Sequence, residues 1–256
     1  MVIRPRNLKE KMESVWFKIL LDNTIEKDQP LWEPPRNYFR ASSVGEPCGR
    51  TLALSMLGHR IPFPARTLRI FKTGNAIEDV NLAVLKDAGV LVSSQGEVEF
   101  KLPDGGPFIK GHYDAVIKRE KTKHLLEIKS INEFDFAKLP TEHDTVIAGD
   151  SPLMKRYPKY IQQWNTYAGH KDTPNIGMVL FEAKNSQKHK TYFLEHDVLL
   201  FADLLYRLEE IHKQAIQGMI PARPREHECR NYLCKKLPSE AVTIEEAKKI
   251  DGELRG

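Results

Sequence analysis

Two short segments place acidic and basic side chains within otherwise apolar sequence. The stretch KGHYDAVI, residues 110–117, carries Asp114, and LLEIKS, residues 125–130, carries Glu127 and Lys129. Alternate side chains of a strand share one face of its sheet, so Glu127 and Lys129 would point the same way. If the two segments pair as a hairpin, we expect Asp114 and Glu127 to meet on that face, near one end.

Two carboxylates that converge beside an apolar core repel each other unless a cation lies between them. Mg²⁺ suits such a site because it prefers oxygen ligands and keeps several of its waters. A lysine two residues from the glutamate can orient an attacking water or stabilise negative charge that builds on a phosphate. Asp114, Glu127 and Lys129 are therefore typical of a phosphodiesterase, although a salt-bridged group on an exposed sheet face would use the same residues.

The surrounding pattern predicts an α/β protein with a mixed sheet. The PDGG sequence at 103–106 predicts a turn, and KREKTK at 118–123 predicts a charged hairpin tip. Apolar periodicity and turn residues predict helices at 7–28, 50–58, 74–88, 157–170 and 197–218, strands at 90–101, 108–118, 124–130, 176–184 and 190–197, and a last helix within 239–250 capped by Ser239 or Thr243.

The composition is that of an ordinary globular chain. Its 256 residues are 41% hydrophobic and 29% charged, enough to bury a sizeable core in one domain with elaborations. No stretch approaches the roughly 20 apolar residues of a membrane span. The N-terminus lacks the apolar core of a signal peptide, so we expect a cytoplasmic or nucleoid-associated protein. A net charge of +4, with basic clusters at 118–124 and 223–236, weakly indicates a polyanionic partner.

The cysteines are too few for a disulfide framework. Cys48 stands alone, whereas Cys229 and Cys234 lie close together near the C-terminus. An odd count in a chain that we expect to be intracellular indicates free thiols or metal ligands.

Taken in order, four segments resemble the motifs of the PD-(D/E)XK nuclease superfamily, in particular its RecB-like branch of CRISPR-associated and phage-encoded exonucleases. FKTGNAIED at 71–79 resembles the helical first motif, with Glu78 where many members have histidine. KGHYDAVI and LLEIKS resemble the second and third motifs. YPKYIQQWNTYAGH at 157–170 resembles the helical Q-x-x-x-Y motif, with Gln163 and Tyr167.

The resemblance implies a restriction-endonuclease-like core, in which a mixed central sheet is flanked by helices. We expect this core to span residues 71–196. A helical region at 1–70 would precede it, and a helical region at 197–256 would follow, carry the cysteine pair and pack on the core as one domain.

The resemblance also implies roles for the acidic residues. Asp114 and Glu127 would bind Mg²⁺ or Mn²⁺, helped by the main-chain carbonyl of Ile128. Glu78 would supply a further carboxylate, although its replacement of histidine leaves the number of metal ions open. Lys129 would be the catalytic lysine.

Two helical residues would complete this site. Gln163 and Tyr167 are about one helical turn apart and so share a face, from which they would position the DNA strand or the catalytic lysine. His112 is either an active-site neighbour or a structural histidine with satisfied hydrogen bonds.

Some RecB-like nucleases hold a 4Fe–4S cluster with one cysteine before the core, in a C-x-R context, and three after it. Cys48, Cys229 and Cys234 match this arrangement in outline, but a cubane usually takes four cysteines. His227 would be the fourth ligand, with Glu226 or an exogenous ligand as alternatives. Two alternatives stay open: a zinc ion bound by three cysteines and a histidine, or three free thiols.

These patterns favour a metal-dependent deoxyribonuclease, an exonuclease that acts at DNA ends in recombination, repair or CRISPR and phage DNA processing. Arg36, Arg40, Arg50 and Trp164 would line a basic channel with aromatic stacking. A non-catalytic DNA-binding or scaffold subunit and a restriction-type endonuclease are the alternatives. A protein partner or an oligomer is compatible with each, and cleavage polarity and strand preference cannot be read from these residues.

Overall fold

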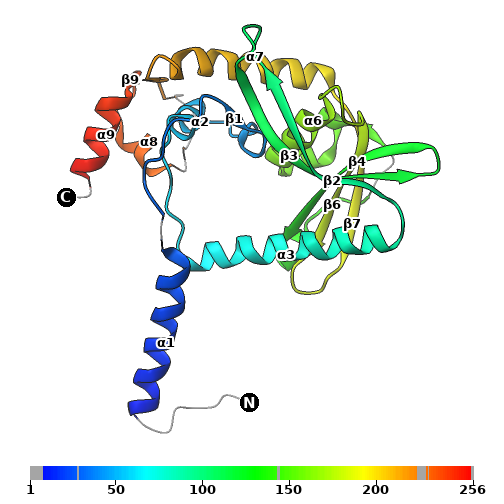
Figure 1. Cartoon of the computed structure of the whole chain (residues 1–256), viewed down its shortest axis with the longest axis horizontal. Helices are drawn as coiled ribbons and strands as arrows, with labels where there is room; N and C mark the ends of the chain where they lie inside the picture. The colour runs from blue at the N-terminus through cyan, green and yellow to red at the C-terminus, as the bar shows by residue number, and fades with distance from the viewer. Residues whose placement is uncertain (1–7, 28, 143–144, 224–228, 230, 255–256) are drawn as a thin grey trace.

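A computed structural model describes residues 8–27, 29–142, 145–223, 229 and 231–254 (Figure 1). In this part of the chain no helix is long and apolar enough to cross a membrane. Its α-helices are α1 (Leu8–Glu26), α2 (Gly49–Met56), α3 (Ala65–Asp87), α4 (Glu133–Ala137), α5 (Pro152–Arg156), α6 (Pro158–Ala168), α7 (Val198–Ala215), α8 (Tyr232–Lys236) and α9 (Ile244–Glu253).

One mixed sheet of seven strands holds the described chain together. Its order is β1-β3-β4-β6-β7-β5, and β2 pairs with the other edge of β3. β4 runs parallel to β6, while the β3–β4 and β6–β7 pairs are antiparallel. The strands are β1 (Phe39–Arg40), β2 (Leu91–Lys101), β3 (Pro107–Arg119), β4 (Thr122–Ile131), β5 (Val146–Ile147), β6 (Ile176–Ala183) and β7 (His189–Glu195); β8 (Met219–Ile220) and β9 (Val242–Thr243) form a separate pair.

Helices cover both faces of this sheet. Leu82 and Leu85 of α3 pack against Leu126 and Ile128 of β4, while Leu125 belongs to the larger core on the other face, where α6 and α7 lie (Figure 1). A strand that is buried on both faces needs apolar side chains on both, which is why the LLEI run does not alternate with polar residues. The predicted fold class, a mixed central sheet flanked by helices with helical extensions, is confirmed.

The edge of β3 that faces β4 changes its partner partway along. Pairing with β1 ends at Lys110, and pairing with β4 begins at Ala115. Residues 111–114 pair with neither strand on this edge. The sheet therefore opens over four residues, and the last of them is Asp114.

Helix α3 begins earlier than its sequence pattern predicts. We expect a helix at 74–88 after a loop, whereas α3 starts at Ala65, directly after Pro64. Its first turns are mostly exposed, so they carry no apolar periodicity that a sequence reading could detect. Arg69 in this part pairs with Asp22 of α1 at 2.6 Å. The predicted boundary between residues 70 and 71 thus lies within one helix.

The C-terminal segment folds back towards α2. Thr243 caps α9 through a capping box with Glu246, which decides between the two caps that the sequence allows. Arg50 of α2 is fully buried, and its guanidinium donates hydrogen bonds to main-chain carbonyls of this segment at Pro221 and Pro238. Helix α2 and the C-terminal segment therefore share one core.

Candidate active site

Asp114 and Glu127 lie where the β3–β4 ladder ends. Glu127 is fully buried and Asp114 is 8% exposed. Oδ2 of Asp114 accepts a hydrogen bond from the main-chain N–H of Ile128 at 2.7 Å. The carboxylate thus replaces the missing ladder partner of β4, which holds the two strands together while their backbones separate.

Glu127 has one occupied and one unoccupied carboxylate oxygen. Oε1 accepts hydrogen bonds from Nζ of Lys129 and from Nε2 of Gln163, the latter at 2.6 Å. Oε2 is buried and has no hydrogen-bond partner among the described residues. A buried carboxylate oxygen without a partner is costly, and a cation at this oxygen would remove the cost.

Tyr167 of α6 fills the opening in the edge of β3. A Cβ at Gly111 would lie 2.8 Å from the tyrosine hydroxyl, so only glycine leaves room for it there. The main-chain N–H of His112 donates a hydrogen bond to this hydroxyl, and Nε2 of Gln163 lies 3.5 Å from it. Burial raises the pKa of Tyr167, so the phenol remains protonated. Gln163 and Tyr167 thus reach the two strands from one face of α6.

Glu78 approaches from α3 and is held by Gln95, a residue that the sequence reading missed. Nε2 of Gln95 donates a hydrogen bond to Oε1 of Glu78. The neighbours of Gln95 in β2 pair with Ala115 and Tyr113, so Gln95 lies opposite Asp114 without pairing to it. Its φ of 52° is in the left-handed region, which is strained for a residue other than glycine. The only feature of the sequence that could have pointed to this strained position is Gly96, which follows it directly.

The three carboxyl groups resist ionisation together. Burial, followed by the charge of Asp114, raises the pKa of Glu127 to about 8 and that of Glu78 to about 7. Burial also raises the pKa of Asp114. Burial alone would lower the pKa of Lys129, but Glu127 and Asp114 raise it above its ordinary value. A bound divalent cation would reverse the carboxyl shifts, because it favours the charged forms.

The acidic side chains here are of the kind that a hard divalent cation binds, although the ligand oxygens of Glu78, Asp114 and Glu127 do not all lie within 4.8 Å of one another in this structure. All three acidic side chains offer oxygen, which is what Mg²⁺ and Mn²⁺ bind, and Glu127 has an unpartnered oxygen. The role of the Ile128 carbonyl stays a prediction, since the contact that the structure gives at Ile128 is made by its N–H.

Two residues predicted to line a DNA channel lie inside the core, so that prediction is wrong for them. Trp164 is fully buried among core side chains of α6. Arg50 is also fully buried, and its guanidinium donates hydrogen bonds to main-chain carbonyls, including those of Ser239 and Glu240. Neither side chain can reach a nucleic acid, because an aromatic residue on the inner face of α6 and an arginine between two chain segments are enclosed by packing.

Arg36 and Arg40, the other two arginines predicted to line the channel, differ in their surroundings. Arg36 pairs with Glu33 at 2.8 Å. Arg40 is exposed at a pocket of about 420 Å³ that it shares with His112, Gln163 and Tyr167. His112 is therefore a neighbour of the candidate active site.

The three cysteines meet in the core, although they come from distant segments. Their Sγ atoms all lie within 4.8 Å of one another, and those of Cys48 and Cys234 are 3.8 Å apart. Cys229 contacts Oγ1 of Thr51 at 2.9 Å. The cysteine site is therefore preformed. His227 and Glu226, which we expect to be alternative fourth ligands, lie outside the described residues.

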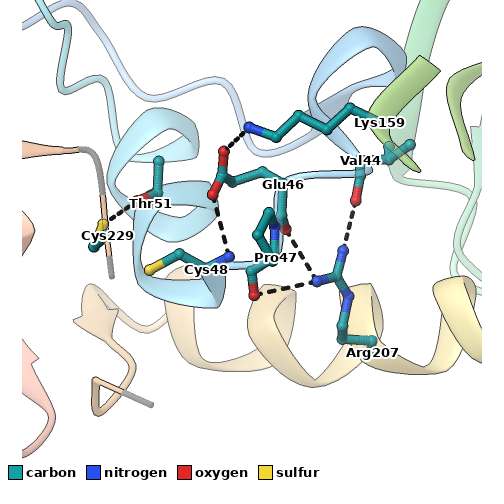
Figure 2. Close-up of polar contacts among 8 residues, drawn as sticks. All are labelled: Val44, Glu46, Pro47, Cys48, Thr51, Lys159, Arg207 and Cys229. Carbon is teal, nitrogen blue, oxygen red and sulfur yellow. Dashed lines mark hydrogen bonds and ion pairs between the residues drawn. The ribbon is translucent and has the colours of Figure 1, made fainter. Parts of the chain in front are cut away.

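Figure 2 shows how the loop before Cys48 is fixed. Arg207 donates hydrogen bonds to the carbonyls of Val44 at 2.6 Å and Glu46 at 3.0 Å. The carboxylate of Glu46 accepts from the N–H of Cys48 and pairs with Lys159 of α6. The cysteine site is thus joined to the helix that carries Gln163 and Tyr167.

No protein-family model matches this chain, and no curated protein matches it. Among solved structures it is similar to an alkaline exonuclease, LHK-Exo from Laribacter hongkongensis, at 14% identity and a TM-score of 0.49, over 71% of this chain and 89% of that one. The same exonuclease in complex with dAMP gives the same values. SSO0001 is similar at 15% identity and a TM-score of 0.44, over 78% of this chain and 85% of that one.

Proposed function

We propose that this protein is a metal-dependent nuclease that hydrolyses phosphodiester bonds of DNA and acts at DNA ends. The observation that carries the proposal is Glu127: it is fully buried, Lys129 and Gln163 bind one of its oxygens, and the other lacks a partner within the described chain. Asp114 and Glu78 lie within electrostatic reach of it. A divalent cation bound between these carboxylates would supply the missing partner of Glu127 and offset the repulsion among the three acidic side chains.

Each residue then has a distinct role in the proposed reaction. Asp114, Glu127 and Glu78 would hold Mg²⁺ or Mn²⁺, with the Ile128 carbonyl as a further ligand. The bound ion would supply Lewis-acid chemistry at the phosphate and a more acidic water. Lys129 keeps its proton at neutral pH, so it would stabilise negative charge on the phosphate or orient the attacking water, and would not act as the base.

The helical pair would keep the carboxylate in place. Gln163 fixes the orientation of Glu127, and Tyr167 stays neutral and braces the opening beside Asp114. The Q-x-x-x-Y helix and the cysteine pattern support an exonuclease of the RecB-like type over a restriction-type endonuclease. We further propose a cytoplasmic role in recombination, repair or the processing of CRISPR or phage DNA.

The test is cleavage of end-labelled linear DNA, single- and double-stranded, beside a closed circle, with Mg²⁺, Mn²⁺ or EDTA. Lys129→Ala is the inactive variant, and Lys123→Ala, an exposed lysine of the same strand, is its control. Metal-dependent loss of label from linear DNA, abolished only in Lys129→Ala, is the expected result. Cutting of the circle would establish an endonuclease. Binding without any cleavage would favour the scaffold alternative.

We also propose that Cys48, Cys229 and Cys234 hold a metal centre that fastens the C-terminal segment to α2. With Zn–S bonds of about 2.3 Å, a tetrahedral zinc ion separates its sulfur ligands by about 3.8 Å. The sulfur atoms of Cys48 and Cys234 are 3.8 Å apart. A cubane cluster binds each thiolate to a different iron and spreads the sulfurs further, so this spacing supports a single zinc ion over 4Fe–4S.

Metal analysis of the full chain, purified without oxygen, tests this centre. We expect one zinc per chain and no visible absorption, with the zinc lost in Cys48→Ser. About four irons per chain with a broad visible band would establish the cluster instead. If the analysis finds neither zinc nor iron, the three cysteines are free thiols.

A further inference from the structure

A second pocket, of about 730 Å³, opens beside the candidate active site. It lies between the start of α6 and the segment that carries Cys229 and Lys235. Tyr160 belongs to both places, because it lines the pocket and its ring centre lies 5.3 Å from Nζ of Lys129. The Tyr160 ring therefore connects this pocket with the candidate catalytic lysine.

The pocket has an aromatic wall. The rings of Tyr157 and Tyr160 stack at a centroid distance of 5.6 Å with only 12° between their planes. The guanidinium of Arg156 lies 5.5 Å from the centre of the Tyr157 ring. Flat aromatic and guanidinium surfaces are what unpaired bases stack on, with little dependence on sequence.

The charges that line the pocket favour an anion. Lys159 is paired with Glu46, and Arg156 is paired with Asp135 at 3.4 Å, so these charges largely cancel. Lys235 is exposed and has no ion-pair partner among the residues that the structure describes. Among the described lining residues, its charge is therefore the one that no ion pair offsets.

The size of the pocket favours a single strand. A sphere of 730 Å³ would be roughly 11 Å across, which is still less than the width of the major groove of a duplex alone, about 12 Å. Tyr160, Gln163 and Tyr167 lie on one side of α6, so a strand that follows this side passes from the pocket to the carboxylates.

We propose that this pocket, the tyrosine pocket, binds the single-stranded nucleotides on one side of the bond that is cleaved. Bases stack on Tyr157 and Tyr160, and Lys235 contacts a phosphate. This inference rests on the proposed nuclease function, whose site it extends.

Binding without chemistry tests it. Full-length protein is titrated into a fluorescein-labelled thymidine oligonucleotide without added Mg²⁺ or Mn²⁺, at several salt concentrations and beside a labelled duplex, and the anisotropy is recorded. Lys235→Ala is compared with Lys236→Ala, because Lys236 is equally exposed but lines a different pocket. Tyr160→Leu is compared with Tyr160→Phe, which keeps the ring.

We expect Tyr160→Leu to weaken single-strand binding roughly 10-fold and Tyr160→Phe to leave it unchanged. Lys235→Ala should lower the slope of log affinity against log salt by about 0.7, and Lys236→Ala should not. Equal affinities in each pair, or an equal loss for the duplex, would overturn the proposal. Cleavage by the wild type is measured separately: if it is absent while the two pairs still differ, the nuclease function fails and the strand-binding pocket stands.

Discussion

Gln163 donates a hydrogen bond from Nε2 to Oε1 of Glu127 at 2.6 Å, which joins α6 to the centre of the sheet. Both side chains are buried, so no water can replace the donor. We predict that Gln163→Leu lowers the apparent Mg²⁺ affinity in cleavage assays by about 10- to 100-fold, as is usual when a residue that orients a metal ligand is lost.

Gln162 provides the control for this prediction. It neighbours Gln163 on α6 but is only partly buried and makes no side-chain hydrogen bond that the structure describes. Gln162→Leu should leave the Mg²⁺ titration unchanged. If both variants behave alike, Gln163 serves the stability of α6 and not the orientation of Glu127.

The raised pKa of Glu127 predicts that the metal-free protein loses stability as the pH rises. With a pKa of about 8 in the fold against 4.5 in the unfolded chain, the folded state binds more protons between these values. Stability must then fall with increasing pH across that range, and Glu78 acts in the same direction up to about pH 7. Glu127→Gln removes the ionisation, so in EDTA it should gain on the order of 3 kcal/mol relative to wild type between pH 5 and pH 8.

Urea unfolding at both pH values measures this difference. Glu120→Gln, in the exposed β3–β4 turn, is the control and should follow the wild type. Saturating Mg²⁺ should raise the stability of the wild type at pH 8, because ligand that binds only the folded state stabilises it, and should not raise that of Glu127→Gln. Parallel pH profiles for wild type and Glu127→Gln in EDTA would contradict the prediction.

The sequence predicted the position of a side chain where the regular repeat of a single strand or helix sets the face on which that side chain lies. Asp114, Glu127 and Lys129 could be placed on one face of a hairpin because strands alternate, and Gln163 and Tyr167 on one helix face because helices repeat. By contrast, Cys48 could be expected to lie near Cys229 and Cys234 only through the resemblance, because no helix or strand repeat links residues so far apart in the sequence.

The parts that sequence could not supply depend on long-range contacts. Arg50 and Trp164 have the residue types of a DNA channel, and only the packing of the C-terminal segment and of α6 shows that they are enclosed. Gln95 was missed because its function comes from a strained backbone opposite Asp114, which residue type does not reveal.

The strain at Gln95 can be separated from its hydrogen bond. Gln95→Gly removes both the left-handed strain and the contact with Glu78, whereas Gln95→Ala removes only the contact. Because the left-handed conformation costs a residue with a Cβ about 1 kcal/mol, Gln95→Gly should be more stable than Gln95→Ala by about that amount. Both should weaken Mg²⁺ binding equally. Thermal unfolding and Mg²⁺ titration distinguish the effects; an alanine variant as stable as the glycine one would show that the strand is not strained.

Arg50 should matter for stability and not for DNA contact. Its fully buried guanidinium serves the carbonyls of Pro221, Pro238, Ser239 and Glu240. Arg50→Met would leave these acceptors without their donor, at about 3 kcal/mol or more. Arg36→Met, which breaks a pair with the partly exposed Glu33, should cost less than about 1 kcal/mol.

The two measurements for Arg50 are urea unfolding and the salt dependence of single-strand binding at a temperature where the variant is folded. A buried arginine releases no counterion from DNA, so the salt slope of Arg50→Met should equal that of the wild type. A slope lower by about 0.7 would mean that Arg50 contacts a phosphate, which requires the C-terminal segment to leave α2 when DNA binds. An unchanged slope together with the loss of stability would establish Arg50 as the link between α2 and the C-terminal segment.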